Sequence, residues 1–157
     1  MSGEFFRLGL IAALCMLLIA AAITDLRSRI ISNRLNIAIA ALAPLWWLAN
    51  GLDPWPGMAI QLLLGAIVFA LFAGLFALGM MGGGDVKLLG ALALWFSVQT
   101  TLSLLMLMAI LGGVVTLLTV VHHRVRKKPG QPEIPYGVAI SLATLWLIGE
   151  RYLNQFA

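Results

Sequence analysis

The sequence predicts an all-α membrane protein with about six transmembrane helices. Hydrophobic residues make up 62% of the 157-residue chain and charged residues only 10%, against roughly 25% charged in a soluble domain. The mean hydropathy is +1.02. Apolar runs that could cross about 30 Å of hydrocarbon recur along the chain, separated by short polar or glycine-rich segments. We therefore expect residues 1–157 to form a single integral-membrane domain.

The first half of the chain contains three predicted helices. Residues 5–24 form the first, in which Arg7 can reach the outer interface by snorkelling. Because the stronger positive charge follows this run, we expect an uncleaved helix whose N-terminus lies outside. Residues 35–50 form the second helix, with two tryptophans near its far end, and residues 58–78 form the third after a turn-rich connection.

The second half of the chain adds three more predicted helices. Residues 101–121 are long enough to span a bilayer, whereas residues 88–96 are short, and we expect this helix to extend back toward Asp85. A proline-bearing loop then leads into a last, weakly long helix around residues 138–148.

The distribution of basic residues indicates how many helices cross. If the short segment 88–96 crosses, eight of the ten Lys and Arg residues face one side: Arg27, Arg29, Arg34, Lys87, Arg124, Arg126, Lys127 and Lys128. By the positive-inside rule this side is the cytoplasm, which predicts six helices with both termini in the periplasm. The net charge of +4 therefore reflects membrane topology, and we predict no nucleic-acid partner.

Three of the six acidic residues fall on the cytoplasmic side in this topology: Asp25, Asp85 and Glu133. Asp25 closes the first apolar run and Asp85 precedes another, so both sit near the same membrane boundary. Ionisable residues at such a depth are costly and tend to be functional. Two structural alternatives stay open: Asp25 can pair with Arg29 one turn later, and Asp85 can serve as the N-cap of its helix.

Two neighbouring carboxylates can hydrolyse a peptide bond if they share one proton. The ionised member takes a proton from the attacking water while the neutral member hydrogen-bonds the carbonyl oxygen, as in aspartic proteases. Such a site uses no metal and no cofactor. The lone Cys15 and the adjacent His122 and His123 do not form a set of metal ligands either.

Three segments of the chain resemble the type IV prepilin peptidases, aspartic proteases with a Gly-x-Gly-Asp motif. The segments are Asp25-Leu26-Arg27-Ser28-Arg29-Ile30-Ile31-Ser32-Asn33, Gly82-Gly83-Gly84-Asp85-Val86-Lys87-Leu88 and Ile134-Pro135-Tyr136-Gly137-Val138-Ala139. Their order and spacing agree with that family across nearly the whole chain, and each lies at a predicted cytoplasmic helix boundary. One departure is Ser32, where the family commonly has proline.

The resemblance implies that Asp25 and Asp85 form the catalytic pair. It also implies a set of residues that bind the substrate or shape the site: Gly82, Gly83, Gly84, Lys87, Arg29, Asn33, Pro135, Tyr136 and Gly137. The glycines would let a substrate backbone or a neighbouring helix approach Asp85, although a flexible turn also explains them. The implied substrate is a prepilin or pseudopilin, cleaved at the cytoplasmic face of a bacterial inner membrane, with the lipid bilayer and the pilus assembly machinery as further partners.

Larger members of that family carry a cysteine-rich segment and an N-methyltransferase activity. With one cysteine and a short loop at residues 26–34, this chain resembles the peptidase-only members, including those of tight-adherence pili, which implies no methyltransferase activity and no zinc. Two other classes of function remain: a small proton-coupled transporter or channel whose ion path the two aspartates line, and a non-catalytic scaffold. A scaffold would tolerate asparagine at both positions.

Overall fold

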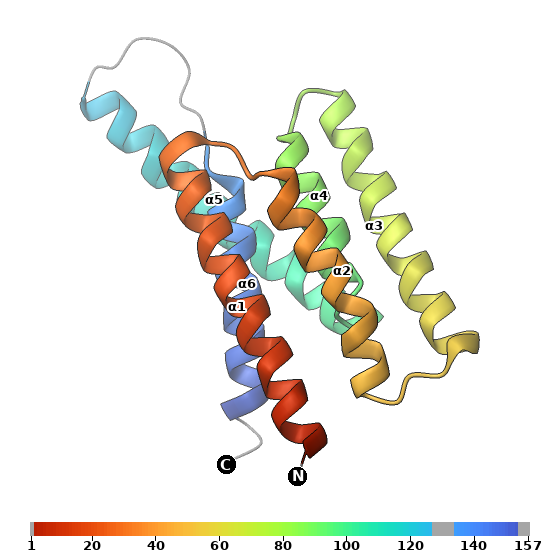
Figure 1. Cartoon of the computed structure of the whole chain (residues 1–157). Helices are drawn as coiled ribbons and strands as arrows, with labels where there is room; N and C mark the ends of the chain where they lie inside the picture. The colour runs from red at the N-terminus through yellow and green to blue at the C-terminus, as the bar shows by residue number, and fades with distance from the viewer. Residues whose placement is uncertain (1, 127–133, 154–157) are drawn as a thin grey trace.

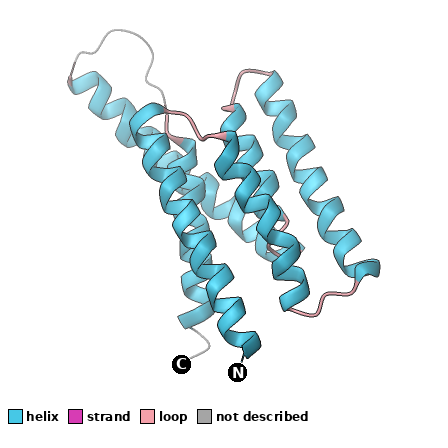
Figure 2. Cartoon of the chain, in the orientation of Figure 1, coloured by secondary structure: helices cyan, strands magenta, loops and turns pink. Residues whose placement is uncertain are grey.

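The computed structural model describes residues 2–126 and 134–153, and these residues form helices and connecting loops without a strand (Figure 2). The elements are α1 (Ser2–Ser28), α2 (Asn33–Ala49), a short turn η1 (Pro54–Met58), α3 (Ala59–Ala77), α4 (Gly83–Ala93), α5 (Val98–Val125) and α6 (Tyr136–Leu153) (Figure 1). The predicted all-α class is therefore confirmed. Lys127, Lys128 and Glu133, which entered the topology argument, lie outside the described residues.

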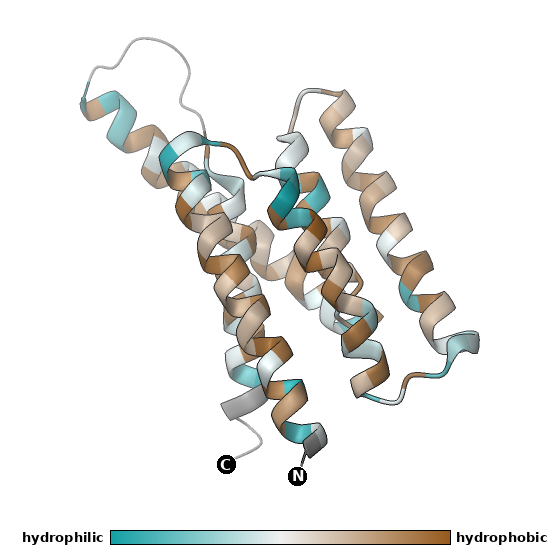
Figure 3. Cartoon of the chain, viewed as in Figure 1, coloured by the Kyte–Doolittle hydropathy of each residue, from teal (hydrophilic) through white to brown (hydrophobic). Residues whose placement is uncertain are grey.

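Three of the described helices are long and apolar enough to cross a membrane by themselves. They comprise Gly3–Ser28, Pro54–Ala77 and Val98–Val125. Many large apolar side chains are exposed, as expected where the solvent is lipid. Hydrophobic residues also predominate along the helices (Figure 3). The chain is a membrane protein, while crossing by α2, α4 and α6 and the periplasmic position of the termini stay predictions.

Helix α4 differs most from its predicted bounds. It begins at Gly83, which agrees with the expected extension toward Asp85, but it ends at Ala93 and not at residue 96. Eleven residues at about 1.5 Å each rise only about 16 Å, roughly half the hydrocarbon thickness. The helix therefore ends inside the bundle.

Side chains from neighbouring helices satisfy the carbonyl groups that this early ending leaves free. The indole N–H of Trp47 donates to the Leu94 carbonyl over 2.6 Å, and the Gln61 amide donates to the carbonyls of Leu94 and Phe96, each over 3.0 Å. An unsatisfied carbonyl in a membrane interior costs several kcal/mol, so such partners permit a short helix there.

Helix α4 occupies the centre of the bundle. It contacts α2, α3, α5 and α6, while α1 packs against α2 and α6 (Figure 1). From Asp85 to Ala93 every residue of α4 is buried except Lys87. The α1–α2 loop, the α3–α4 loop and the start of α6 lie together at one end of the bundle, and the start of α1 lies at the other (Figure 1).

Short sequence signals set where helices begin and stop at the end of the bundle where these loops gather. Ser32 caps α2, because its hydroxyl accepts a hydrogen bond from the Leu35 N–H over 3.3 Å. Serine at this position thus has a structural role of its own. Gly79 follows α3 with a φ of +72°, a conformation that glycine adopts without steric cost, and it turns the chain toward α4.

Replacing Gln61 with leucine tests the role of the hydrogen bonds at the end of α4. The variant Gln61→Leu removes both bonds and leaves the Phe96 carbonyl poorly satisfied, so we expect a loss of about 1–2 kcal/mol in the free energy of unfolding. Reversible unfolding in mixed detergent micelles measures it. Gln99→Leu, at an exposed position of α5, is the matched control, and an equal loss in both variants would contradict this role.

Candidate active site

Asp25 and Asp85 line one cavity at the end of the bundle where the loops gather. Asp25 lies in the last turn of α1 and Asp85 in the first turn of α4, and their exposed fractions are only 4% and 8%. The cavity has a volume of about 600 Å³ and is lined by Asp25, Ser28, Arg29, Ile30, Gly79, Met80, Met81, Gly82, Asp85, Ile134 and Tyr136. The two carboxylates thus share one open space although they are 60 positions apart in the sequence.

The start of α6 holds the Asp25 carboxylate. The backbone N–H of Val138, the third residue of α6, donates to Asp25 Oδ2 over 3.1 Å. The first N–H groups of a helix have no partner within the helix, and together with the helix dipole they favour a negative group. Asp25 is therefore fixed by a helix end that lies 113 residues away in sequence, while the charge of Arg29, the alternative partner, also acts on it.

Asp85 does not cap its own helix, so that alternative is wrong. The N-cap of α4 is Gly82, and Asp85 is the third residue of the helix. Its carboxylate folds back over the helix start, because a Cβ atom on Gly82 would lie only 2.9 Å from Asp85 Oδ2. Both aspartates are consequently placed at helix N-termini, Asp85 at that of α4 and Asp25 at that of α6.

Close packing explains three of the glycines that the sequence singles out. A Cβ atom on Gly84 would meet the Ile31 side chain and carbonyl at 3.2 Å, and one on Gly83 would meet the Phe76 ring at 3.3 Å. At Gly137 a Cβ atom would lie 2.9 Å from Asp25 Oδ2. These glycines allow parts of the same chain to approach, and Gly137 brings the start of α6 onto Asp25.

The remaining predicted site residues divide between the cavity and other places. Arg29 and Tyr136 line the cavity, and Arg29 has a φ of +56° where the chain leaves α1. Pro135 is buried just before α6 and does not line the cavity. Lys87 and Asn33 do not line this cavity: their side chains bond to each other over 2.8 Å and line a separate groove. That these two residues bind substrate or shape the site stays a prediction.

Helix geometry explains why Lys87 does not line the cavity that contains Asp85. Successive residues of a helix are rotated by about 100°, so residues two apart point in nearly opposite directions. Asp85 and Lys87 therefore face different sides of α4, although they belong to one short motif. The sequence also gave no reason to include Met80 and Met81, which line the cavity only because the α3–α4 loop folds over it.

This arrangement suits proton transfer to and from water. Two buried acids, each near a helix N-terminus, face a cavity that an arginine and a tyrosine also line. Like charges at close range in a site with little water resist joint ionisation, so such a pair tends to hold one proton. Within residues 2–126 and 134–153, no group of three His, Cys, Asp or Glu side chains is arranged to hold a metal ion.

A methyl group at position 137 tests the close approach of α6 to Asp25. In Gly137→Ala the added atom would also lie 2.5 Å from Ile31 Cδ1, so the side chains of Ile31 and Asp25 or the start of α6 must shift. We expect a loss of about 1–3 kcal/mol in the free energy of unfolding in detergent. Gly149→Ala is the control in the same helix, since nothing lies within 4 Å there. A neutral or stabilising effect at both positions would refute the close approach.

A comparison with models of protein families identifies the relationship of this chain. Residues 12–117 match the type IV leader peptidase family, a segment that contains both aspartates and more than half of the chain. No curated protein and no solved structure gives a significant match.

Proposed function

Because this chain belongs to the type IV leader peptidase family, we propose that it is an aspartic endopeptidase that removes the leader peptide of a type IV prepilin or pseudopilin with Asp25, Asp85 and water. The observation that carries the proposal is the meeting of two buried carboxylates in one open cavity. The family match supports peptide hydrolysis over an ion path or a scaffold.

In the proposed mechanism the two aspartates hold one proton between them and act on a bound water molecule. The ionised carboxylate takes a proton from this water as its oxygen attacks the scissile carbonyl carbon. The neutral carboxyl donates a hydrogen bond to the carbonyl oxygen, which becomes the hydroxyl of a tetrahedral intermediate. Collapse of the intermediate breaks the C–N bond: one carboxyl proton passes to the leaving amine, and a hydroxyl of the intermediate returns its proton to the other carboxylate as the new carboxylic acid forms. The pair then again holds one proton.

The contacts of each carboxylate support this chemistry without assigning the proton to one residue. The N–H of Val138 and the start of α4 favour negative charge at both positions, and both side chains are largely buried. The pair would titrate as a unit, so its activity would depend on two apparent pKa values that belong to the dyad.

The charge pattern supports cleavage at the cytoplasmic face of a bacterial inner membrane. Arg27, Arg29 and Arg34 surround the α1–α2 loop beside the cavity, and Lys87 lies near the start of α4. A substrate whose basic leader precedes a hydrophobic helix would place its cleavage site at this boundary. In this proposal the protein crosses the membrane six times, acts without a cofactor, does not methylate its product and works beside the pilus assembly machinery.

Substitution of each aspartate tests the dyad. Asp25→Asn and Asp85→Asn each remove the ability to exchange a proton at one member, and we expect processing of a co-expressed prepilin to fall by about 10²–10⁴-fold. Immunoblots that separate precursor from mature pilin measure the loss, and membrane fractionation reports insertion. Asp53→Asn, in the exposed loop before η1, is the matched control. Normal processing by either active-site variant would reject the dyad.

Cysteine mapping tests whether both aspartates face the cytoplasm. In a Cys15→Ala background we expect Ser28→Cys and Met80→Cys, exposed positions at the cavity, to resist a membrane-impermeant maleimide until the membrane is opened. Asp53→Cys, near the other end of the bundle, should react in intact spheroplasts. Labelling of Ser28→Cys and Met80→Cys from opposite sides would leave no shared site.

A further inference from the structure

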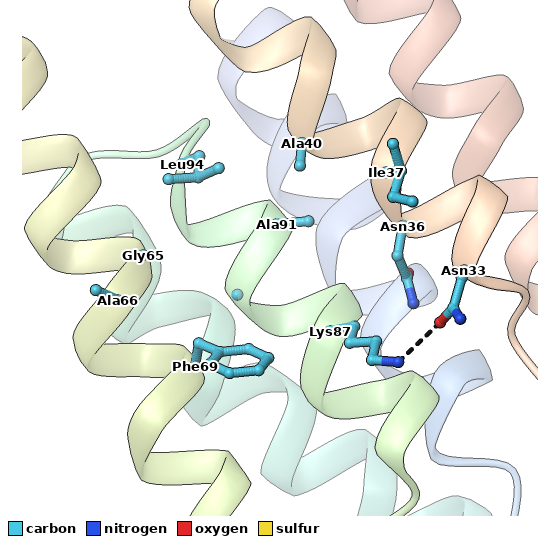
Figure 4. A pocket seen from close by; sticks show the side chains of 11 residues that line it. Asn33, Asn36, Ile37, Ala40, Gly65, Ala66, Phe69, Lys87, Ala91 and Leu94 are labelled. Carbon is cyan, nitrogen blue, oxygen red and sulfur yellow. Dashed lines mark hydrogen bonds between the residues drawn. The ribbon is translucent and has the colours of Figure 1, made fainter.

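A second cavity lies on the other side of α4 from the aspartates. It is a groove of about 540 Å³ between α2 and α3, with α4 as its floor (Figure 4). Its lining residues that carry the argument are Asn33, Asn36, Ala40, Ala66, Lys87 and Ala91. The groove is polar at the end where α2 and α4 begin and apolar along the rest of its length.

The polar end of the groove presents unused hydrogen-bonding capacity. Lys87 Nζ donates to Asn33 Oδ1 over 2.8 Å, which leaves further N–H donors and the positive charge available (Figure 4). Asn36 is only 4% exposed, and its Nδ2 donates to the Gly84 carbonyl over 3.1 Å. Among the described residues its Oδ1 has no hydrogen-bond partner. Because Asn36 Oδ1 is itself covered, a ligand here would offer an anion to Lys87 and would reach Asn36 Oδ1 with a donor once the Asn36 amide turns toward the groove.

The floor of the apolar part of the groove is almost completely buried. Its floor residue Ala91 is only 5% exposed, and Gly90 beside it is buried under the Phe69 side chain. A helix with side chains is about 10–12 Å wide, so it could rest on the rims but not reach this floor. A single hydrocarbon chain is thin enough to lie along Ala40, Ala66 and Ala91.

We propose that this groove binds one phospholipid whose headgroup carries a hydrogen-bond donor in addition to its phosphate. The phosphate lies at Lys87, a headgroup hydroxyl or ammonium donates to Asn36 Oδ1, and one acyl chain lies in the apolar part of the groove. Charge complementarity selects the phosphate, since a lysine next to the headgroup region attracts anionic lipid. A headgroup with a hydrogen-bond donor should bind more tightly than one without, because Asn36 Oδ1 is a buried polar atom without a partner and such atoms are costly.

Native mass spectrometry of the full-length protein in detergent tests this site with four defined lipids. We expect phosphatidylglycerol and phosphatidylethanolamine to bind one molecule per chain. Phosphatidylcholine, whose headgroup has no donor, should bind about tenfold more weakly. Diacylglycerol, which lacks the phosphate, should also bind weakly. Lys87→Met should remove the preference for phosphatidylglycerol over diacylglycerol, because it keeps the apolar stem and removes the charge.

Variants that fill the groove separate this site from general lipid adhesion. Ala40→Phe places a ring in the groove and should reduce phosphatidylglycerol binding at least about tenfold. Ala41→Phe, the next residue of α2 and exposed outside the groove, should bind as the unaltered protein does. Ala66→Phe fills the groove from α3 and provides the same test if Ala40→Phe does not fold.

Three outcomes would overturn the proposal. Equal binding by the Ala40→Phe, Ala66→Phe and Ala41→Phe variants would mean that the lipid lies elsewhere. Displacement of the lipid by millimolar inorganic phosphate would indicate an anion site without a place for an acyl chain. Displacement by a synthetic hydrophobic helical peptide, with crosslinks to position 40 or 66, would assign the groove to a helix instead.

Discussion

The need to satisfy every backbone group of a short buried helix governs this structure. Helix α4 rises only about 16 Å and ends within the bundle, where water is scarce. Trp47 from α2 and Gln61 from α3 supply the donors at its last carbonyls, and Asn36 supplies one at its first turn. These bonds place α2 and α3 on either side of α4. The cavity, the groove and the height of Asp85 all depend on this arrangement.

The end of α1 and the start of α6 meet at Asp25. Val138, near the end of the chain, bonds to Asp25 in the first helix, and Gly137 makes room for this contact. As a result a helix N-terminus faces each carboxylate, that of α6 for Asp25 and that of α4 for Asp85. Fixed backbone groups of this kind need no rearrangement during a reaction, which suits electrostatic stabilisation of charge in a site with little water.

One helix serves two surfaces of different chemistry. Asp85 faces the cavity that contains Asp25, while Lys87 faces the groove between α2 and α3, because residues two apart are rotated by about 200°. The start of α4 therefore contributes Lys87 to the groove and Asp85 to the cavity. Lipid that orders the start of this helix would also order the turn that positions Asp85, which gives the proposed lipid site a direct physical link to the proposed reaction.

The sequence by itself determined the membrane class, the six helices, and the placement of Asp25 at the end of one helix and Asp85 at the start of another, because hydropathy, helix-breaking glycines and charge act over short stretches of chain. The sequence also indicated the Gly-x-Gly-Asp and Pro-Tyr-Gly segments as candidate parts of the active site. Only the tertiary structure decided that α4 stops at Ala93, that Val138 donates a hydrogen bond to Asp25, and that Lys87 and Asn33 line a groove separate from the cavity. Each of these depends on side chains that meet across tens of residues, and no local pattern encodes such contacts.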